Sequence, residues 1–199
     1  CGNPASATQT ITVDDTTNPV FAAPPADVTV ECIGDVPAMT SLGWTDNCDG
    51  AGSVLGSDAA IVGGNCGGTI TRTWTYTDAC GNPASATQTI TVDDTTNPTA
   101  SNPAPINVEC AAPAPDITVV TDEADNCTAS PVVAFVSDVS DGNSNPETIT
   151  RTYSVTDDCA NSINVTQTIT INDVTNPAIS CPSNITQGVD AGNCNANVS

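Results

Sequence analysis

The sequence contains no lysine and no histidine, and its two arginines face 23 aspartates and glutamates. The formal net charge is −21 at pH 7. A nucleic-acid interface needs Lys and Arg to displace counterions from phosphate, whereas this surface repels both phosphate and anionic lipid. We therefore expect no nucleic-acid partner and no direct insertion of this segment into a membrane.

The same absences argue against catalysis. Without histidine or lysine the chain has no imidazole base, no lysine nucleophile and no lysine to anchor phosphate, and it contains no Gly-rich phosphate loop. Paired carboxylates are present, as in glycosidases, but the Asp-rich loops recur in each unit of the sequence, which is typical of a structural device. We predict that the chain is not an enzyme and has no catalytic residues.

Aromatic residues are also scarce, at 3% of the chain, so a small domain built from this sequence has a thin core and needs additional cross-links. Ten cysteines are present. In the absence of histidine they favour a disulfide framework over a zinc or redox site, and such frameworks are typical of oxidising compartments. This composition predicts an extracellular protein.

An internal repeat organises the chain. Residues 1–19 read CGNPASATQTITVDDTTNP, and residues 80–98 repeat these letters without a change, at an offset of 79 residues. A diverged copy keeps this spacing, since TITRTWTYTDACGN returns as TITRTYSVTDDCAN. The predicted units are the end of one repeat (1–19), a first complete repeat (20–98), a second complete repeat (99–177) and the start of another (178–199). We interpret the chain as a segment of a longer array.

The local pattern predicts an all-β fold. Residues alternate with period two, so that threonine covers one face of residues 69–77 and Ile70, Arg72, Trp74 and Tyr76 lie on the other. Turn residues interrupt the sequence about every ten positions, and no helical spacing is found. The expected strands of the first repeat are 26–31, 39–45, 53–62, 69–77 and 84–93. This spacing predicts one immunoglobulin-like β-sandwich per repeat.

The strand order also predicts where the cysteines lie. Following the strand directions places Cys48 and Cys80 where the first repeat begins, and Cys32 and Cys66 together at its opposite end. The predicted disulfides are therefore Cys32 with Cys66, Cys48 with Cys80 and, in the second repeat, Cys127 with Cys159.

One cysteine of the second repeat is left over, because Asn145 occupies the position equivalent to Cys66. Cys110 is thus expected to have no partner in its own repeat. It is either an unpaired thiol or a link to another chain.

Four motifs together identify a family resemblance: PADVTVEC, TDNC, TITRTWTYTDACGN and TQTITVDDTTNP. The chain resembles the HYR-like repeats that occur in tandem in giant cell-surface proteins of Bacteroidota, with gliding-motility adhesins as the best match. ISCPSNIT followed by DAGNC, within residues 178–199, resembles the start of a neighbouring HYR variant. The resemblance implies secretion, attachment to the outer membrane, and a role in adhesion or in movement across surfaces.

The Asp-rich loops admit two interpretations. Asp and Asn form turns and hold strand ends, and oxygen ligands in clusters also suit weak extracellular Ca²⁺ sites. By the strand directions, the loops at the start of each repeat meet the incoming linker. The candidate calcium ligands at these junctions are Asp15, Asn18, Asp46, Asp78, Asp94, Asn97, Asp125 and Asp157.

Two further sets of residues recur with the repeat. Arg72 and Arg151 occupy equivalent strand positions, and we expect each to pair with a carboxylate or to lie against an aromatic ring, rather than to bind a ligand. The Asp-Thr-Thr of each linker is similar to the O-glycosylation pattern of Bacteroidota. That resemblance makes Thr16 and Thr95 candidate glycosylation sites, against unmodified linker threonine.

These features together predict a structural segment of a long secreted adhesin or filament, with neighbouring repeats of the same chain as its first partners. Surfaces, polysaccharide or other chains in a filament are the expected further partners. One alternative is an array of ligand-binding modules, for example for carbohydrate, which needs an exposed aromatic platform. The other is a passive spacer that carries a functional domain elsewhere.

Overall fold

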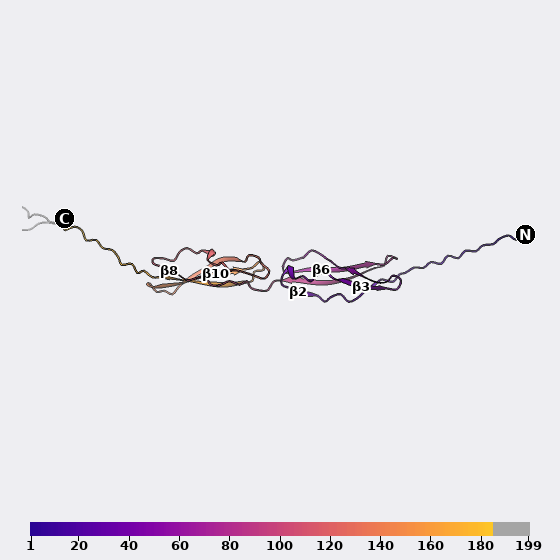
Figure 1. Cartoon of the computed structure of the whole chain (residues 1–199), viewed down its shortest axis with the longest axis horizontal. Helices are drawn as coiled ribbons and strands as arrows, with labels where there is room; N and C mark the ends of the chain where they lie inside the picture. The colour runs from indigo at the N-terminus through magenta and orange to yellow at the C-terminus, as the bar shows by residue number, and fades with distance from the viewer. Residues whose placement is uncertain (185–199) are drawn as a thin grey trace, which may run out of the picture.

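The computed structural model describes residues 1–184, so most of the predicted third unit (178–199), including Cys194, lies outside the described residues. Figure 1 shows two elongated β-rich bodies placed end to end, with the chain running from one end of the array to the other. Apart from two short 3₁₀ turns, η1 (Ile33–Asp35) and η2 (Ile117–Val119), the regular elements of residues 1–184 are strands. None of their helices is long and apolar enough to span a membrane. The all-β fold class is confirmed.

The first repeat contains two sheets. One has the order β2 (Val28–Val30), β7 (Pro83–Asp93), β6 (Cys66–Thr77) and β5 (Ser57–Asp58). The other has the order β1 (Val20–Phe21), β3 (Ser41–Asp46) and β4 (Gly50–Leu55). β2 pairs parallel with β7, and the remaining pairs are antiparallel. Two sheets in one repeat fit the predicted β-sandwich.

The predicted strand 53–62 is not a single strand. It is divided into β4 and β5, which belong to different sheets, and Gly56 lies between them. A Cβ at Gly56 would lie 3.0 Å from atoms of the Trp74 ring. The chain therefore changes sheets where the backbone passes close to Trp74, and only glycine fits without a shift of the ring.

The core lies where the alternating faces of β6 and β7 meet. Ile70, Ile90 and Val92 form a buried cluster, and Trp74 has no exposed surface. The indole Nε1 of Trp74 donates a hydrogen bond to the carbonyl of Thr40 at 2.9 Å, which satisfies the polar atom of this buried ring. The threonines of β6 lie on the opposite, largely exposed face, as the alternation predicts.

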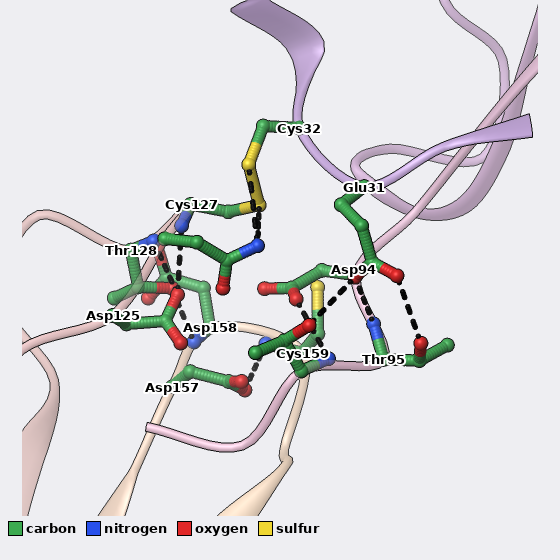
Figure 2. Close-up of a disulfide and its surroundings, with 12 residues drawn as sticks. Glu31, Cys32, Asp94, Thr95, Asp125, Cys127, Thr128, Asp157, Asp158 and Cys159 are labelled. Atoms are coloured by element: carbon green, nitrogen blue, oxygen red, sulfur yellow. Dashed lines mark hydrogen bonds between the residues drawn. A yellow bond between two sulfur atoms is a disulfide. The ribbon is translucent and has the colours of Figure 1, made fainter. Parts of the chain in front are cut away.

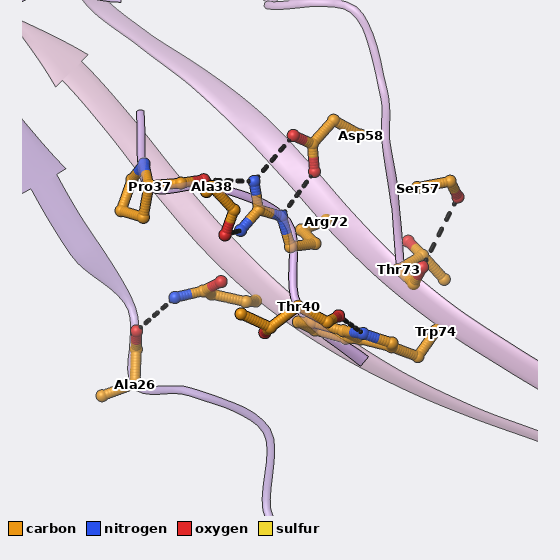
Figure 3. Close-up of polar contacts among 10 residues, drawn as sticks. Ala26, Pro37, Ala38, Thr40, Ser57, Asp58, Arg72, Thr73 and Trp74 are labelled. Atoms are coloured by element: carbon orange, nitrogen blue, oxygen red, sulfur yellow. Dashed lines mark hydrogen bonds and ion pairs between the residues drawn. The ribbon is translucent and has the colours of Figure 1, made fainter. Parts of the chain in front are cut away.

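Arg72 is part of this core and confirms the expected structural role. Its guanidinium binds both carboxylate oxygens of Asp58, at 2.7 and 2.9 Å, and donates to the carbonyls of Pro37 and Ala38 (Figure 3). These contacts fasten the segment before β3 to the sheet of β6. The hydrogen bond from Arg72 lowers the pKa of Asp58 and keeps this carboxylate charged.

The second repeat has one regular sheet in the described part of the chain, with the order β8 (Ile106–Val108), β11 (Ser162–Ile171), β10 (Glu147–Thr156) and β9 (Val132–Ser140). β8 pairs parallel with β11. The second sheet of the first repeat is here reduced to the isolated bridge between Thr99 and Ala124, which is equivalent to the Val20 and Thr45 pair. Pro131 stands where the first repeat has Gly52 of β4 and has no N–H for a strand ladder. An irregular segment therefore covers the sheet.

The second core keeps the main features of the first. Tyr153 takes the place of Trp74 and packs with Val120, Val155 and Val165. Arg151 binds both oxygens of Asp138, each at 2.8 Å, and is also buried. This pair is the counterpart of Arg72 with Asp58, so the two arginines of the chain have the same structural role.

Candidate functional site at the junction between repeats

The linker between the repeats is held by side chains from both of them. Asn161, in the turn after β10, donates from Nδ2 to the carbonyl of Asp94 at 2.9 Å. Glu31, after β2 of the first repeat, accepts hydrogen bonds from the backbone N–H of Thr95 and from the hydroxyls of Thr95 and Thr96. Pro98 ends the linker and is fully buried. These contacts give the linker a defined path.

The same arrangement begins the first repeat. Asn82 donates from Nδ2 to the carbonyl of Asp15 at 3.0 Å, as Asn161 does to Asp94. The Oδ1 of Asp15 accepts from the N–H of Thr17, and Pro19 is buried like Pro98. Each repeat therefore binds the linker that enters it. The roles of Glu31, Asn82 and Asn161 were not predicted from the sequence, although a Glu before and an Asn after a repeat cysteine were visible signals.

Two disulfides cross the junction and correct the predicted connectivity. Cys32 is bonded to Cys127 and Cys66 to Cys159, with Cα atoms 5.2 and 5.3 Å apart. The predicted pairs were Cys32 with Cys66, Cys48 with Cys80, and Cys127 with Cys159, all within one repeat, and the structure forms none of them. The predicted positions explain the error: the end of one repeat abuts the beginning of the next, so each cysteine meets its partner across the junction.

The other cysteines of the two repeats are exposed thiols in the described part of the chain. Cys48 and Cys80, which are equivalent to Cys127 and Cys159, have no disulfide there, and neither has Cys110. The pKa of the Cys48 thiol is raised, chiefly by its hydrogen bond with Asp15. The first repeat thus begins with two thiols at the positions where the second repeat has two disulfides.

Carboxylates from separate segments also converge at both junctions. Oxygens of Asp15, Asp46 and Asp78 lie within 4.8 Å of one another at the start of the first repeat. Oxygens of Asp94 and Asp125 lie equally close at the start of the second. Figure 2 shows the second group with Asp157, beside the disulfide between Cys32 and Cys127. The predicted aspartates are therefore brought together, whereas the linker residues Asn18 and Asn97 are exposed.

Hydrogen bonds within the turns and linkers account for most of these oxygens. The Oδ2 of Asp46 accepts from two backbone N–H groups, of Cys48 and Asp49, and the Oδ2 of Asp125 does the same in its turn. Asp78 and Asp157 use both oxygens, bonding the N–H groups of their own turns and the side chains of Asn82 and Asn161. The remaining buried oxygens have no partner, and they are Asp15 Oδ2, Asp46 Oδ1, Asp94 Oδ2 and Asp125 Oδ1.

The two linker aspartates differ in their electrostatics. Burial, with the negative charges of Asp125, Asp157 and Glu31, raises the pKa of Asp94. The pKa of Asp15 is instead lowered, mainly by the hydrogen bond from the N–H of Thr17. Burial is the largest cause at Asp94 and the hydrogen bond from Thr17 is the largest at Asp15, so the two pKa values shift in opposite directions.

A small cavity of about 50 Å³ lies within the second junction. It is lined by residues of both repeats, among them Glu31, Asp94, Asp158 and the disulfide cysteines Cys32, Cys127 and Cys159. A cavity of this size has room for an ion or a few waters. It lies between the two repeats, beside both disulfides.

The candidate glycosylation residues lie on the linkers. Thr16 and Thr95 are both exposed. The hydroxyl of Thr95 donates to Glu31, so a glycan at this position replaces one contact of the junction. Glycosylation of the two threonines stays a prediction.

The comparison with protein families identifies the first repeat. Residues 20–92 match the HYR-like domain with four cysteines. The four cysteines of this range are Cys32, Cys48, Cys66 and Cys80. The second repeat keeps three of these positions and has Asn145 at the fourth. A search among curated proteins returned no match.

The HYR-like match agrees with the structure of the site. It supports an extracellular, adhesion-related repeat module with a non-catalytic immunoglobulin-like fold. In the HYR-like repeat described above, two of the four cysteines lie at each end, and the pair at the far end bonds to the next repeat. Two of the four cysteines therefore serve the joint between domains rather than the interior of one domain.

Proposed function

We propose that this chain is a load-bearing segment of a long adhesive filament on the cell surface. The observation that supports the proposal is the pair of disulfides that joins one repeat to the next. Cys32 and Cys127 are separated by 95 residues in sequence, and their bond removes the segment between them from the covalent path along the chain. A pulling force is thus carried from repeat to repeat by covalent bonds.

The expected mechanical effect is large. At about 3.3–3.6 Å per extended residue, the 95-residue separation corresponds to about 310–340 Å of chain that the oxidised segment does not release. Single-molecule extension of the chain from its two ends, with and without reductant, measures this length directly. We expect the oxidised chain to be shorter at full extension by that amount.

Matched cysteine variants control this experiment. Replacing Cys127 and Cys159 by serine reproduces the reduced length under oxidising conditions, whereas replacing Cys48 and Cys80 leaves the oxidised length unchanged. Equal lengths for the oxidised and reduced chain contradict a load-bearing role and favour a passive spacer.

The resemblance of the sequence motifs to HYR-like repeats supports a more specific assignment of the filament. We place the filament in the class of Bacteroidota adhesins attached to the outer membrane, with a contribution to gliding motility. Protease treatment of intact cells that carry the full protein is expected to release peptides of this segment. Retention of all such peptides until the cells are lysed contradicts the surface location.

The ligand-binding alternative has less support in the side chains. A carbohydrate site needs an exposed aromatic platform, but Trp74 and Tyr153 are fully buried and Trp44 is 8% exposed. Trp44 is also stacked on Tyr76, with ring centroids 3.7 Å apart. These rings are committed to packing within their repeats.

A further inference from the structure

The junction carboxylates have no basic side chain to neutralise them. Lysine and histidine are absent from the sequence, and the two arginines are occupied by Asp58 and Asp138. Buried carboxylates are costly unless they are paired, bonded or bound to a cation. The negative charge of each junction therefore calls for a partner from solution.

The unpaired oxygens point to the same requirement. Asp94 is 4% exposed and Asp15 is 9% exposed, and the Oδ2 of each is buried without a hydrogen-bond partner. The Oδ1 of the neighbouring turn aspartate, Asp125 or Asp46, is unpaired as well. An equivalent pair of atoms is thus left free at each of two junctions that are 79 residues apart. An accidental orphan atom is not expected to recur at the equivalent position.

We propose that each junction binds a divalent cation of the Ca²⁺ type, held by Asp94 and Asp125 in one case and by Asp15 and Asp46 in the other. Carboxylate oxygens suit a hard cation, and Ca²⁺ accepts 6–8 oxygen ligands that include waters. Cys127 is in a disulfide and supplies no thiolate, which argues against zinc. Asp78 and Asp157 add negative charge to the two sites.

Hydrogen bonds within the turns orient these ligand side chains. In Asp46 and Asp125, one oxygen is fixed by two backbone N–H groups, so the second oxygen has a defined direction. Asp15 and Asp94 are fixed similarly by the N–H of Thr17 and Thr96. Since the two ligands come from the linker and from the following repeat, the cation stiffens the joint. This inference does not depend on the role of the filament in adhesion.

Calorimetric titration of the oxidised chain with CaCl₂ tests the proposal. We expect two binding events, with Kd of about 10⁻⁴–10⁻³ M as in other extracellular modules. Asp94→Asn with Asp125→Asn removes one event, and Asp15→Asn with Asp46→Asn removes the other. Asn keeps the size of the side chain and one carbonyl acceptor for the turn.

Neighbouring aspartates provide matched controls. Asp93→Asn and Asp14→Asn remove the same charge one residue away from each linker ligand, and both calcium events are expected to persist. Thermal melting of the unmodified chain gives a second readout, in which Ca²⁺ raises the Tm and a chelator lowers it. Absence of calcium heat and of any Tm shift up to 10 mM, or equal losses in the control variants, overturns the proposal.

A second inference comes from the exposed thiols. Cys48 and Cys80 are equivalent to Cys127 and Cys159, and the incoming linker is bound at both places by the same asparagine contact. At the second junction this arrangement receives two disulfides from the end of the preceding repeat. We infer that Cys48 and Cys80 receive the end of another HYR-like repeat with cysteines at the positions of Cys32 and Cys66.

The bonds require an oxidant of the disulfide class. Each forms when two thiols lose two electrons and two protons, and the oxidant is reduced to two thiols. Residues 1–19 are identical to 80–98, so placing residues 20–79 before Cys1 adds a complete copy of the first repeat. In this extended chain, serine replaces Cys1 and the added copy of Cys48, so that the added repeat contributes only its two donor cysteines.

Oxidised glutathione serves as the oxidant, and peptic peptides are then mapped without reduction. We expect peptides in which Cys48 and Cys80 are bonded to cysteines of the added repeat. Both thiols are also expected to become unreactive to iodoacetamide, to which they react in the original chain. Thiols that stay reactive, or a bond between Cys48 and Cys80 themselves, overturn the inference.

Discussion

The two repeats have the same period but not the same construction. The first has a second sheet, β1 with β3 and β4, and a Trp44 ring stacked on Tyr76. The second has Glu123, Val155 and Pro131 at the positions of Trp44, Tyr76 and Gly52, and an irregular segment covers its sheet. What both keep is the buried arginine pair and the binding of the incoming linker. The binding of the incoming linker is therefore more constant than the sheets of the repeat that follows it.

The far ends of the repeats differ as well. The first ends with Cys32 and Cys66, both bonded to the next repeat. The second ends with Cys110 and with Asn145, whose side chain exchanges two hydrogen bonds with the backbone of Asp173, each at 3.0 Å. One end is thus built for two covalent links and the other for at most one. Joints of different strength can alternate along one chain.

Reduction of the two disulfides should have the largest effect on the thermal stability of the two repeats. A disulfide that closes a loop of about 100 residues contributes about 4–5 kcal/mol in the chain-entropy model. We expect one thermal transition for the oxidised chain and two for the reduced chain, with the second repeat melting first because it has less regular sheet. Scanning calorimetry with and without reductant measures this. A single transition in both states shows that the repeats are coupled without the disulfides.

Truncation of the central aromatic residue should have the next largest effect. Trp74 and Tyr153 are fully buried, and removal of such a ring costs about 3–5 kcal/mol. In the reduced chain, Trp74→Ala is expected to lower only the transition of the first repeat and Tyr153→Ala only that of the second. The pair of variants assigns the two transitions. A shift of both transitions by either variant contradicts independent repeats.

The sequence predicted the fold better than the site. Strict alternation in β6 and β7 indicated the sheet, and strand direction placed the cysteines at the correct ends. The connectivity was wrong because it depends on how two repeats meet, which no pattern within one repeat contains. Gly56 marks the divided strand in the sequence, and Pro131 marks the irregular segment. Neither effect could be predicted, because the first depends on the position of Trp74 and the second on which strands pair.

The ion pairs of the two buried arginines should make a smaller, pH-dependent contribution to the stability of each repeat. Hydrogen bonds from Arg72 and Arg151 lower the pKa of Asp58 and of Asp138. A folded-state pKa below the unfolded value gives stability that is present above about pH 3.9 and is lost as the pH falls through the folded-state pKa.

Neutral variants isolate this contribution in each repeat. Asp58→Asn should cost about 1–3 kcal/mol at pH 7, through the lost charge-assisted hydrogen bonds, and less at low pH. Asp138→Asn should do the same for the second repeat. Urea unfolding of the reduced chain at several pH values measures both. A cost that does not decline with acid shows that the carboxylate acts through its shape rather than its charge.

The smallest effect on stability is expected from substitutions at the end of the second repeat. Asn145→Ala removes the two hydrogen bonds to Asp173 and, since the site is exposed, should cost about 0.5–1.5 kcal/mol. Asn145→Cys should cost the same, because the cysteine side chain makes neither of the two hydrogen bonds to Asp173. Urea unfolding compares the two variants. A cysteine variant that is more stable than the alanine variant, and that loses this advantage on reduction, reveals a new disulfide and contradicts the equal cost of the two substitutions.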